Sequence, residues 1–412
     1  MRLQLLTALG LLTFISGCSL LGPVAEFQAD QTEGDLPFSV TFNDMSDVAG
    51  DQILSWNWDF GDGETSTARN PVHVYTERGT YNVRLRIVTA RGTGVRFRRN
   101  YINVRQIVRF PDVRLDAALR STLKIPSASI RVADLETLTT FDATGAGISN
   151  LAGLEYASNL QTLILQANSI TEISPLANLR ALTALNLRNN AVSDISPLAA
   201  LTALHTLDLG INAVEDIRPL EGLSKLMLLN LEQNPNLADI RTLRHLTALT
   251  ELSLAFSAIT QSDEIDGAGN GDSLTSISGL TDLVFLDLAS TDIYELRAIA
   301  GLTNLEELIL FECLIENIGP LAELANLREL QLSLNRIVTV DALAGLQQLA
   351  VLTLQMNQIE NISPLVLNSG LGDNDILRLT GNPLNTVSLC NAIPTLKLRG
   401  VLVEVDRTCT SQ

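Results

Sequence analysis

The segment 160–181, LQTLILQANSITEISPLANLRA, and the next segment 182–203, LTALNLRNNAVSDISPLAALTA, place the same residue types at the same positions. Each begins Leu-x-x-Leu-x-Leu-x-x-Asn, continues with a β-branched aliphatic residue, and then reaches Ile-Ser-Pro-Leu. This spacing of 22 residues indicates an array of similar turns, each of which has to stack on its neighbours to bury its leucines. Further turns with this pattern begin at Leu204, Leu226, Leu249, Leu283, Leu305, Leu327 and Leu349.

The residue types within one turn predict its local structure. Leu-x-Leu places both leucines on one side of a short strand and the residue between them on the other side. We expect the strands of successive turns to form one long parallel sheet. The asparagine lies where the chain bends, and its amide can satisfy backbone groups that would otherwise be buried unpaired. Ser-Pro fixes φ and favours a short 3₁₀ segment opposite the sheet.

The array resembles the leucine-rich-repeat family, and its short unit with Ile-Ser-Pro-Leu is similar to the internalin type. A degenerate first repeat near Leu138 and a last repeat that reaches Asn382 bring the expected number to about eleven. Three repeats carry Ser257, Thr291 and Cys313 in place of the asparagine. Because cysteine is a known alternative in this family, the resemblance implies a buried structural role for Cys313, rather than a reactive or metal-binding one.

The ends of such an array have to be covered, because their outermost leucines would otherwise face water. Residues 110–123 place apolar side chains at helical spacing after Pro111 and predict an amphipathic helix at the N-terminal end. Internalin-type proteins have a similar helical cap. Residues 393–401 resemble the C-terminal cap of such arrays.

Residues 24–106 follow a different pattern. Phe38–Phe42 and Tyr81–Ile87 alternate apolar and polar residues at period two, which is typical of strands covered on one side. Between them the segment 56–63, WNWDFGDG, runs from aromatic residues into a tight turn, for which Asp and Gly are suited. We therefore expect an all-β domain here.

This region resembles the PKD domain, an immunoglobulin-like β-sandwich. The residues that carry the resemblance are the segment 58–63, WDFGDG, followed by Asn70, Pro71, His73, Tyr75, Gly79, Tyr81 and Val83. In that family the domain usually acts as a spacer or as a weak contact module for proteins or glycans. The resemblance implies structural roles for His73 and Asp59, because no nucleophile in a recognisable motif accompanies them.

This domain also holds a group of basic side chains, which contrasts with the acidic remainder of the chain. Two interpretations are open: the group contacts anionic envelope polymers, or it is a solvated face. The residues are Arg84, Arg86, Arg91, Arg96, Arg98 and Arg99.

The N-terminus predicts export. Arg2 precedes a short apolar run, residues 3–15, which has the length of a signal-peptide core and is too short to span a bilayer comfortably. The run ends in Ile15-Ser-Gly-Cys18, which resembles the lipobox of bacterial lipoproteins, where the cysteine thiol receives the lipid. The resemblance implies a signal peptide over residues 1–17 and a lipidated tether over 18–23. With Ser19 after the cysteine, it implies an anchor in the outer membrane; a plain signal peptide is the alternative.

Four cysteines occur in the sequence. Cys18 is the expected lipid site and Cys313 a repeat position, which leaves Cys390 and Cys409 as the expected disulfide of an exported chain. Two free thiols are the alternative. A bridge over a loop of this size would stabilise the fold by about 3 kcal/mol in the chain-entropy model.

The strand residues that point away from the leucines are the candidate binding residues, because repeat arrays usually bind through the concave side of the sheet. Aligning the repeats places Glu251, Phe285, Glu307 and Glu329 in one column. Three earlier repeats have small or polar residues in this column: Thr162, Ala184 and Thr206. Exposed aromatic residues surrounded by carboxylates often anchor partners, although one or two surface phenylalanines are also normal. The predicted ligand-binding residues are Glu251, Phe285, Asp287, Glu307, Ile309, Phe311, Glu329 and Gln331.

Neither a metal site nor a catalytic motif is predicted. The segment 263–272 in a longer repeat holds several acidic residues and glycines, but its spacing does not match an EF-hand, so a solvated loop is favoured over a calcium site. His205 and His245 occupy variable repeat positions, and no nucleophile elbow, zinc motif or dinucleotide fingerprint occurs. We expect no cofactor and no enzymatic activity.

The composition limits the partners. The formal net charge is -18, with 46 acidic and 28 basic side chains, so the chain would repel nucleic acid phosphates. Hydrophobic residues make up 46% and aromatic residues only 4%, which is typical of repeated aliphatic layers. Apart from the N-terminal run, no stretch of the sequence is apolar enough to cross a membrane.

The expected fold is mainly β with short helices. It consists of a PKD β-sandwich over 24–106, a helical N-terminal cap over 107–137, leucine-rich repeats over 138–388 and a C-terminal cap over 389–412. The predicted function is recognition or adhesion at the cell surface, through binding of a protein or polysaccharide. The alternatives are a scaffolding protein that faces the periplasm and an enzyme with an unrecognised site. The sequence does not predict the oligomeric state.

Overall fold

The computed structural model describes residues 22–260 and 273–409 and divides the chain into two compact units, Met1–Ile107 and Val108–Gln412. Cys18 and the acidic segment 263–272 lie outside the described residues. Within those two ranges, no helix combines the length and the apolar character needed to cross a membrane.

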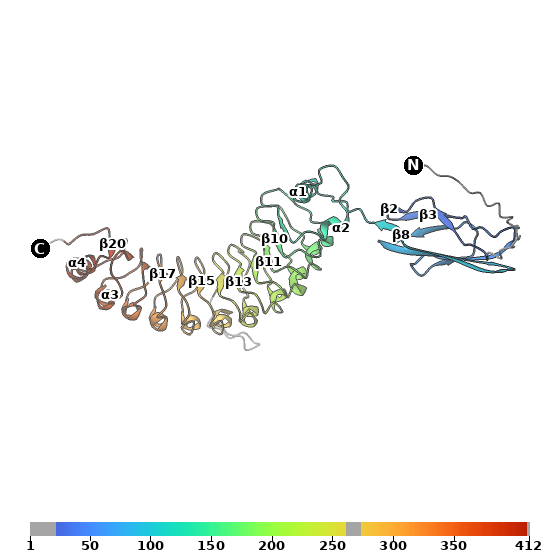
Figure 1. Ribbon diagram of the computed structural model, residues 1–412. Coiled ribbons are helices and arrows are strands. Elements are labelled where there is room, and N and C mark those ends of the chain that lie inside the picture. The colour runs from blue at the N-terminus through green and yellow to red at the C-terminus, as the bar shows by residue number, and fades with distance from the viewer. Residues whose placement is uncertain (1–21, 261–272, 410–412) are drawn as a thin grey trace, which may run out of the picture. The chain divides into compact units, whose positions relative to one another are not determined.

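The first unit is a sandwich of two β-sheets (Figure 1). One sheet has three antiparallel strands in the order β1-β3-β6, and the other has five in the order β2-β8-β7-β4-β5. The strands are β1 (Phe27–Ala29), β2 (Glu33–Asp35), β3 (Phe38–Asp44), β4 (Ile53–Asp59), β5 (Thr65–Ser66), β6 (Val72–Tyr75), β7 (Gly79–Thr89) and β8 (Gly92–Arg105).

Aromatic side chains fill the space between these two sheets. Trp58 is fully buried, and its ring lies 5.2 Å from that of Phe27 and 5.7 Å from that of Phe42. A buried ring that carries a polar atom usually has a hydrogen-bond partner for that atom. Trp58 Nε1, for example, donates to Ala68 O at 2.9 Å. The alternation of Phe38–Asp44 points its aromatic residues inward, as the period-two pattern predicts.

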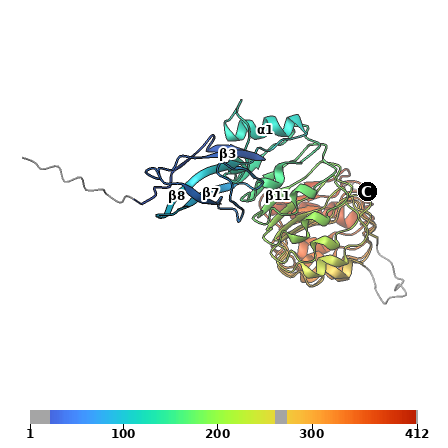
Figure 2. The same ribbon diagram turned by 90° about the vertical axis from the view of Figure 1, so that its right-hand side faces the viewer.

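The second unit is a solenoid whose twelve strands form one parallel sheet (Figure 1). Seen from a direction turned by 90°, its successive turns lie behind one another (Figure 2). The strands are β9 (Thr140–Asp142), β10 (Thr162–Ile164), β11 (Ala184–Asn186), β12 (Thr206–Asp208), β13 (Leu228–Asn230), β14 (Glu251–Ser253), β15 (Phe285–Asp287), β16 (Glu307–Ile309), β17 (Glu329–Gln331), β18 (Val351–Thr353), β19 (Ile376–Arg378) and β20 (Leu402–Glu404).

Short helices lie on the outer side of the curved array, and the strands lie on its inner, concave side (Figure 1). Several of these helices begin with the Ser-Pro pair, as the sequence predicts. They are η1 (Leu154–Tyr156), η2 (Ser174–Leu176), η3 (Ser196–Ala200), η4 (Arg218–Leu220), η5 (Arg241–His245), η6 (Ser273–Ile277), η7 (Arg297–Ile299), η8 (Gly319–Glu323), η9 (Asp341–Gly345) and α3 (Ser363–Leu367).

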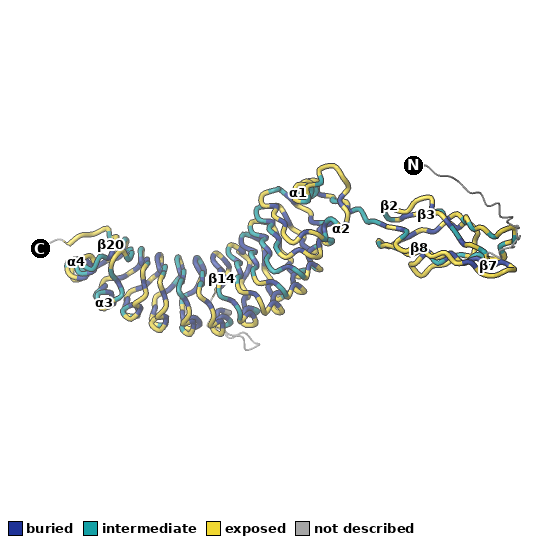
Figure 3. The backbone as a smooth tube through the Cα atoms, in the orientation of Figure 1, coloured by how far each residue is buried: buried dark blue, intermediate teal, exposed yellow. Residues whose placement is uncertain are grey.

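The core of the solenoid is a continuous stack of buried leucines and isoleucines inside the turns. Buried residues, dark blue along the tube in Figure 3, recur in each turn. In the second repeat, for example, Leu163, Leu165 and Ile170 are fully buried. Burial of each such side chain stabilises the fold by roughly 1.5–3 kcal/mol relative to its exposure to water. Only the neighbouring turns make that burial complete.

Asparagines connect successive turns through hydrogen bonds. Asn212 Nδ2 donates to Leu187 O and to Leu209 O, both at 3.0 Å, while its Oδ1 accepts from Val192 N at 2.9 Å. One buried amide therefore satisfies backbone groups of two adjacent repeats. The same pattern occurs at Asn168, Asn190, Asn234, Asn335, Asn357 and Asn382.

This ladder of asparagines is interrupted in three consecutive repeats. Thr291 Oγ1 donates to Leu288 O at 2.6 Å, and Cys313 Sγ contacts the same oxygen at 3.3 Å. Ser257 Oγ is buried without a hydrogen-bond partner among the described residues. Cys313 is thus buried at a repeat position, and burial raises the pKa of its thiol.

Both ends of the array are covered. At the N-terminal end α1 (Val113–Leu123) buries Leu115 and Leu119 and is followed by α2 (Val132–Leu135). At the C-terminal end the helices η10 (Ser388–Ala392) and α4 (Ile393–Leu398) precede β20, which adds a twelfth strand to the sheet beyond the expected eleven repeats. A disulfide joins Cys390 and Cys409 in this cap.

The N-cap of α1 ties the cap to the first repeat. Asp112 Oδ1 accepts from Arg114 N at 2.8 Å, and its Oδ2 accepts from Ser149 N at 2.7 Å and Asn150 N at 3.1 Å. Despite the partial burial of the carboxylate, these backbone donors lower the pKa of Asp112 to about 2. The ionised side chain therefore joins two segments that are distant in the sequence.

Candidate functional site

The strands β14–β17 bring the predicted binding residues together. Their register places Glu251, Phe285, Glu307 and Glu329 opposite one another on four neighbouring strands. A second row, one alternation along the strands, pairs Asp287 with Ile309 and Ile309 with Gln331. Phe311 follows Ile309 by two residues along the chain. We call these eight residues the concave patch: Glu251, Phe285, Asp287, Glu307, Ile309, Phe311, Glu329 and Gln331.

The aromatic rings of the concave patch are less exposed than the sequence suggested. Phe285 and Phe311 are both half-buried. Neighbouring strands lie about 4.8 Å apart, so the side chains of adjacent repeats pack against the edges of each ring. The patch therefore offers partly covered aromatic surface between carboxylates, instead of freely projecting rings.

Several carboxylates of the concave patch are held in unfavourable surroundings. Burial, together with the neighbouring charges of Glu329, Asp287 and Glu251, raises the pKa of Glu307. Burial also raises the pKa of Asp287, and the charge of Glu232 adds to this effect. Ionisation of both carboxylates therefore carries a cost, which a cationic group placed over the patch would offset.

Three of the predicted residues are also engaged within the protein. Asp287 Oδ1 accepts from Ala289 N at 3.0 Å, so this carboxylate helps to fix the turn after β15. Gln331 Nε2 donates to Glu329 Oε1 at 2.7 Å, which orients that carboxylate. These contacts hold part of the patch in a defined geometry before any partner binds.

An ion pair that was not predicted from the sequence borders the concave patch. Arg188 and Glu232 form a half-buried salt bridge that reaches from the repeat of β11 to that of β13. A Cβ atom added at Gly210, in the repeat between them, would lie 2.7 Å from Arg188 Nη1, so this glycine leaves room for the pair. In the sequence, Arg188, Gly210 and Glu232 align two positions before the ladder asparagines of their repeats. This alignment is the sequence feature that could have predicted the ion pair.

Phe256 adds an exposed aromatic side chain near the concave patch. Its side chain is 48% exposed. It lies in the turn after β14 with a φ of 55°, a left-handed conformation that directs the side chain out of the stack. Leu334 and Met356 occupy the same turn in later repeats and are exposed as well.

In the first unit, His73 and Asp59 have structural partners. His73 is buried, its Nε2 lies 2.6 Å from Asp62 Oδ2, and its ring stacks on Phe60 at 4.1 Å. Asp59 Oδ2 accepts from Arg84 Nη2 at 3.0 Å. Both residues thereby contribute to the packing and turns of the sandwich.

The arginines of this unit are partly paired within it. Glu26 forms ion pairs with Arg96 at 3.3 Å and with Arg98 at 2.7 Å, and the Arg98 guanidinium also lies 4.9 Å from the ring centre of Tyr101. Arg84 is paired with Asp59, as described above. These internal pairs reduce the basic charge available to an anionic polymer, which favours the interpretation as a solvated face.

Outside the concave patch, the histidines of the solenoid lie on its surface. His205 and His245 are exposed, and His245 Nε2 lies 3.6 Å from Glu221 Oε1. Within residues 22–260 and 273–409, no three side chains of the His, Cys, Asp and Glu types are arranged to hold a metal ion.

Comparisons with known families identify both domain types. Residues 21–104 match the PKD domain family, and residues 158–200 and 180–225 match a family described as leucine-rich repeats in two copies. The two matches agree with the sandwich and the solenoid seen in the structure.

Curated collagenases resemble the chain in its PKD region. Collagenase ColA of Bacillus cereus is 54% identical over 41 residues, which are 10% of this chain and 4% of the collagenase. The pre-pro-metalloprotease PrtV of Vibrio cholerae is 38% identical over 72 residues, which are 18% of this chain and 7% of that protein. The chain thus spans a small fraction of these relatives, and the collagenase matches do not include a catalytic domain.

A solved structure resembles the solenoid. An internalin (InlF) from Listeria monocytogenes has 29% sequence identity and a TM-score of 0.61, and the alignment covers 72% of this chain and 91% of the internalin. Domains of the PKD and leucine-rich-repeat types are typically non-catalytic, and internalin-like repeats are protein-interaction folds. The chain therefore consists of a PKD domain followed by a leucine-rich-repeat solenoid with internalin-like structural neighbours.

Proposed function

We propose that this chain is a non-catalytic recognition protein that binds a partner protein through the concave patch. The observation that carries the proposal is the register of β14–β17, which aligns the half-buried ring of Phe285 with carboxylates on the adjacent strands, while the half-buried Phe311 follows β16. Partly buried aromatic residues surrounded by polar groups are the usual anchors of protein interfaces.

The charge of the concave patch favours a basic partner. Asp287 and Glu307 are charged in surroundings that oppose ionisation, and Glu232 adds further negative charge beside them. A lysine or arginine of a partner would stabilise the ionised forms, whereas an anionic polysaccharide would be repelled. A basic protein surface with an apolar side chain for the phenylalanines fits both features.

The test is binding of the whole chain to arrays of secreted and cell-surface proteins. The double variant Phe285→Ala/Phe311→Ala is expected to weaken a specific interaction at least about tenfold, because truncation of central aromatic anchors has effects of this size. The matched control, Thr162→Ala/Thr206→Ala, changes the same strand position in earlier repeats and should leave binding intact. Equal affinity of all three proteins would contradict the proposal.

The carboxylates provide a second readout of the same interaction. Glu307→Gln/Glu329→Gln should slow association, and the association rate of the unmodified chain should fall as salt is added. An association rate that responds neither to the substitutions nor to salt would rule out a cationic partner surface. The aromatic contact would still be tested by the phenylalanine variants.

We also propose that the protein is exported and anchored by a lipid on Cys18. The support is the apolar run 3–15 followed by the lipobox-like residues Ile15–Cys18. Cells that express the protein with a labelled fatty acid should transfer the label to the unmodified chain and not to Cys18→Ser. Label on the variant, or none on either chain, would leave a plain signal peptide as the alternative.

The proposed location is the outer membrane with the solenoid outside the cell. Protease added to intact cells should then degrade the solenoid. Protection in intact cells combined with degradation after permeabilisation would favour the alternative role, a scaffolding protein that faces the periplasm.

A further inference from the structure

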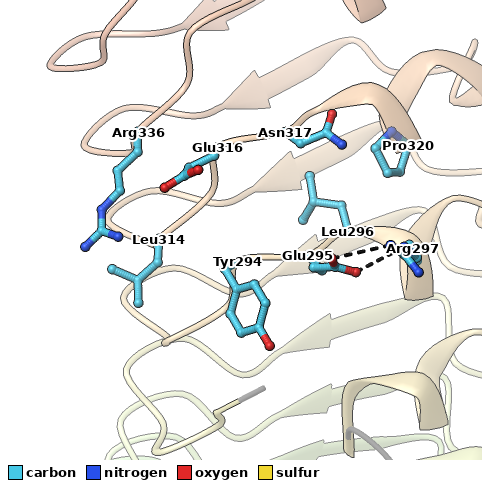
Figure 4. A pocket seen from close by; sticks show the side chains of 9 residues that line it. All are labelled: Tyr294, Glu295, Leu296, Arg297, Leu314, Glu316, Asn317, Pro320 and Arg336. Carbon is cyan, nitrogen blue, oxygen red and sulfur yellow. Dashed lines mark hydrogen bonds and ion pairs between the residues drawn. The ribbon is translucent and has the colours of Figure 1, made fainter. Parts of the chain in front are cut away.

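A hollow of about 390 Å³ lies between the turns that follow β15 and β16, away from the concave patch (Figure 4). One row of its side chains runs from Tyr294 to Arg297, and the next row runs from Glu316 to Pro320, one repeat later (Figure 4). Arg336 comes from a third repeat. The volume falls in the range of roughly 300–1,000 Å³ typical of small-molecule sites. We call this hollow the lateral pocket.

An aromatic side chain distinguishes this repeat from the others. Tyr294 follows the isoleucine after the ladder position, and it is the only aromatic residue in the sequence at this point of a repeat. Its ring is half-buried in the wall of the lateral pocket. The corresponding residues are Thr171, Ser193, Glu215, Ala238, Thr260, Glu316, Val338 and Glu360. The pocket is therefore more than the ordinary gap between two turns.

The residues after this position supply polar groups to the pocket. In several repeats the next residue caps the following helix: Asp194 accepts from Ser196 N at 2.8 Å, and Asn317 Oδ1 accepts from Gly319 N at 2.8 Å. In the tyrosine repeat Glu295 occupies this position, as Glu172 does in an earlier repeat, and Glu295 Oε2 lies 3.0 Å from Arg297 Nε. Polar groups of the tyrosine repeat thus face the pocket. In the next repeat, the hydrogen bond from Gly319 N holds the Asn317 amide in place.

The lateral pocket carries no surplus of charge. Its two carboxylates, Glu295 and Glu316, are balanced by the guanidinium groups of Arg297 and Arg336, in a chain whose net charge is -18. A site for an anion or a cation would carry an excess of the opposite charge. The balance points to a neutral ligand that both donates and accepts hydrogen bonds.

Apolar and polar surfaces are combined in a way that suits a sugar. The Tyr294 ring, Leu314 and Pro320 supply apolar area, while Glu316, Asn317 and Arg336 supply acceptors and donors. A pyranose ring has an apolar face of C–H groups and hydroxyls around its edge, and aromatic rings stack on such faces.

A second hollow of about 390 Å³ adjoins the first at Arg336 and is lined by Leu334 and Met356 among others. Both of these side chains are exposed. Arg336 lines both hollows, and Leu334 and Met356 give the second one apolar surface for a further sugar residue.

We propose that the lateral pocket binds a neutral oligosaccharide. One sugar stacks on the Tyr294 ring, and its hydroxyls bond to Glu316, Asn317 and Arg336. The next sugar lies beyond Arg336, toward Met356. This site is separate from the concave patch and does not depend on the function proposed for it.

The test uses the whole chain and three neutral disaccharides: cellobiose, maltose and chitobiose. Saturation-transfer NMR at about 10 mM sugar detects dissociation constants in the millimolar range. At least one disaccharide is expected to bind. Tyr294→Ala should weaken that binding about tenfold, while Tyr294→Phe, which keeps the ring, should stay within about threefold of the unmodified chain.

Control measurements separate this site from the concave patch and from misfolding. Phe285→Ala should bind the sugar as the unmodified chain does, and the circular dichroism of Tyr294→Ala should be unchanged. Binding that Phe285→Ala abolishes would place the sugar on the concave patch and overturn the proposal. Absence of binding to all three disaccharides, or binding of digalacturonic acid alone, would overturn it equally.

Discussion

The repeats of β11–β13 and the repeats of β14–β16 have the same backbone course but satisfy their buried backbone groups differently. In the first group a ladder asparagine such as Asn212 bonds to groups of two adjacent turns. In the second group Thr291 and Cys313 contact one shared carbonyl, and Ser257 Oγ has no partner among the described residues. The concave patch lies on the strands of this second group and its neighbour β17.

The difference indicates which repeats stabilise the solenoid and which repeats contain groups that destabilise it. Buried groups without partners and repelling carboxylates both reduce the free energy of unfolding. The central repeats hold the unpartnered Ser257 Oγ and the repelling carboxylates Asp287 and Glu307. On either side the asparagine ladder is intact, although burial and the charge of Glu232 also raise the pKa of Asp208 on β12. Because the stability of a repeat array is approximately a sum over repeats and their interfaces, the flanking ladder can support a less stable centre.

The largest expected effect is the loss of a ladder asparagine. Asn212→Ala removes hydrogen bonds to Leu187 O, Leu209 O and Val192 N, and it leaves these groups buried. We expect the free energy of unfolding to fall by about 3 kcal/mol in urea denaturation followed by circular dichroism. The matched control is Ser257→Ala, which removes a hydroxyl without a partner and should change stability little. Equal losses in both variants would remove the distinction between the two groups.

The N-terminal cap contains a carboxylate whose pKa is lowered, in contrast to the raised pKa values of carboxylates in the concave patch. Asp112→Ala should cost about 2 kcal/mol, because it removes an N-cap and leaves the Ser149 and Asn150 amides unpaired. The pKa of Asp112 is lowered from 3.8 to about 2, so its stabilisation is present above pH 3.8 and lost as pH falls toward 2. Denaturation at several pH values should show the two proteins converging in acid. A difference that persists at pH 2 would show that packing, and not the charge, is responsible.

Restoring the ladder should stabilise the centre. Ser257→Asn would return the amide to a repeat that lacks it, and we expect a gain of about 1 kcal/mol in the free energy of unfolding. Hydrogen exchange should slow in the repeats of β13 and β14. A destabilised variant would mean that the turn at residue 257 has no room for the amide.

The smallest expected effect concerns repulsion within the concave patch. Glu307→Gln should stabilise the chain at neutral pH by about 0.5 kcal/mol, because like charges on adjacent strands repel. The pKa of Glu307 is raised above 4.5, so the cost of its charge disappears as pH falls below the raised value. The two proteins should be equally stable in acid, and the control Glu251→Gln, at an exposed position, should change less. A variant less stable at neutral pH would show that Glu307 has a favourable partner.

Much of the solenoid could be predicted from the period of the sequence. The Leu-x-Leu pairs, the asparagines and the Ser-Pro pairs are local signals, and each determines one part of a turn wherever it occurs. The alignment of repeats also placed Glu251, Phe285 and Glu307 correctly in one row, because in-register stacking leaves no freedom in the pairing of parallel strands.

What the sequence by itself determined is the pair of domain types, the order of the repeats and the residues that share the concave face. Only the tertiary structure decided how far Phe285 and Phe311 are covered, that Arg188 reaches Glu232, and that Tyr294 lines a pocket with side chains of the next two repeats. The physical reason is the same in each case. These properties depend on contacts between different turns, whereas the repeat pattern describes what recurs in every turn.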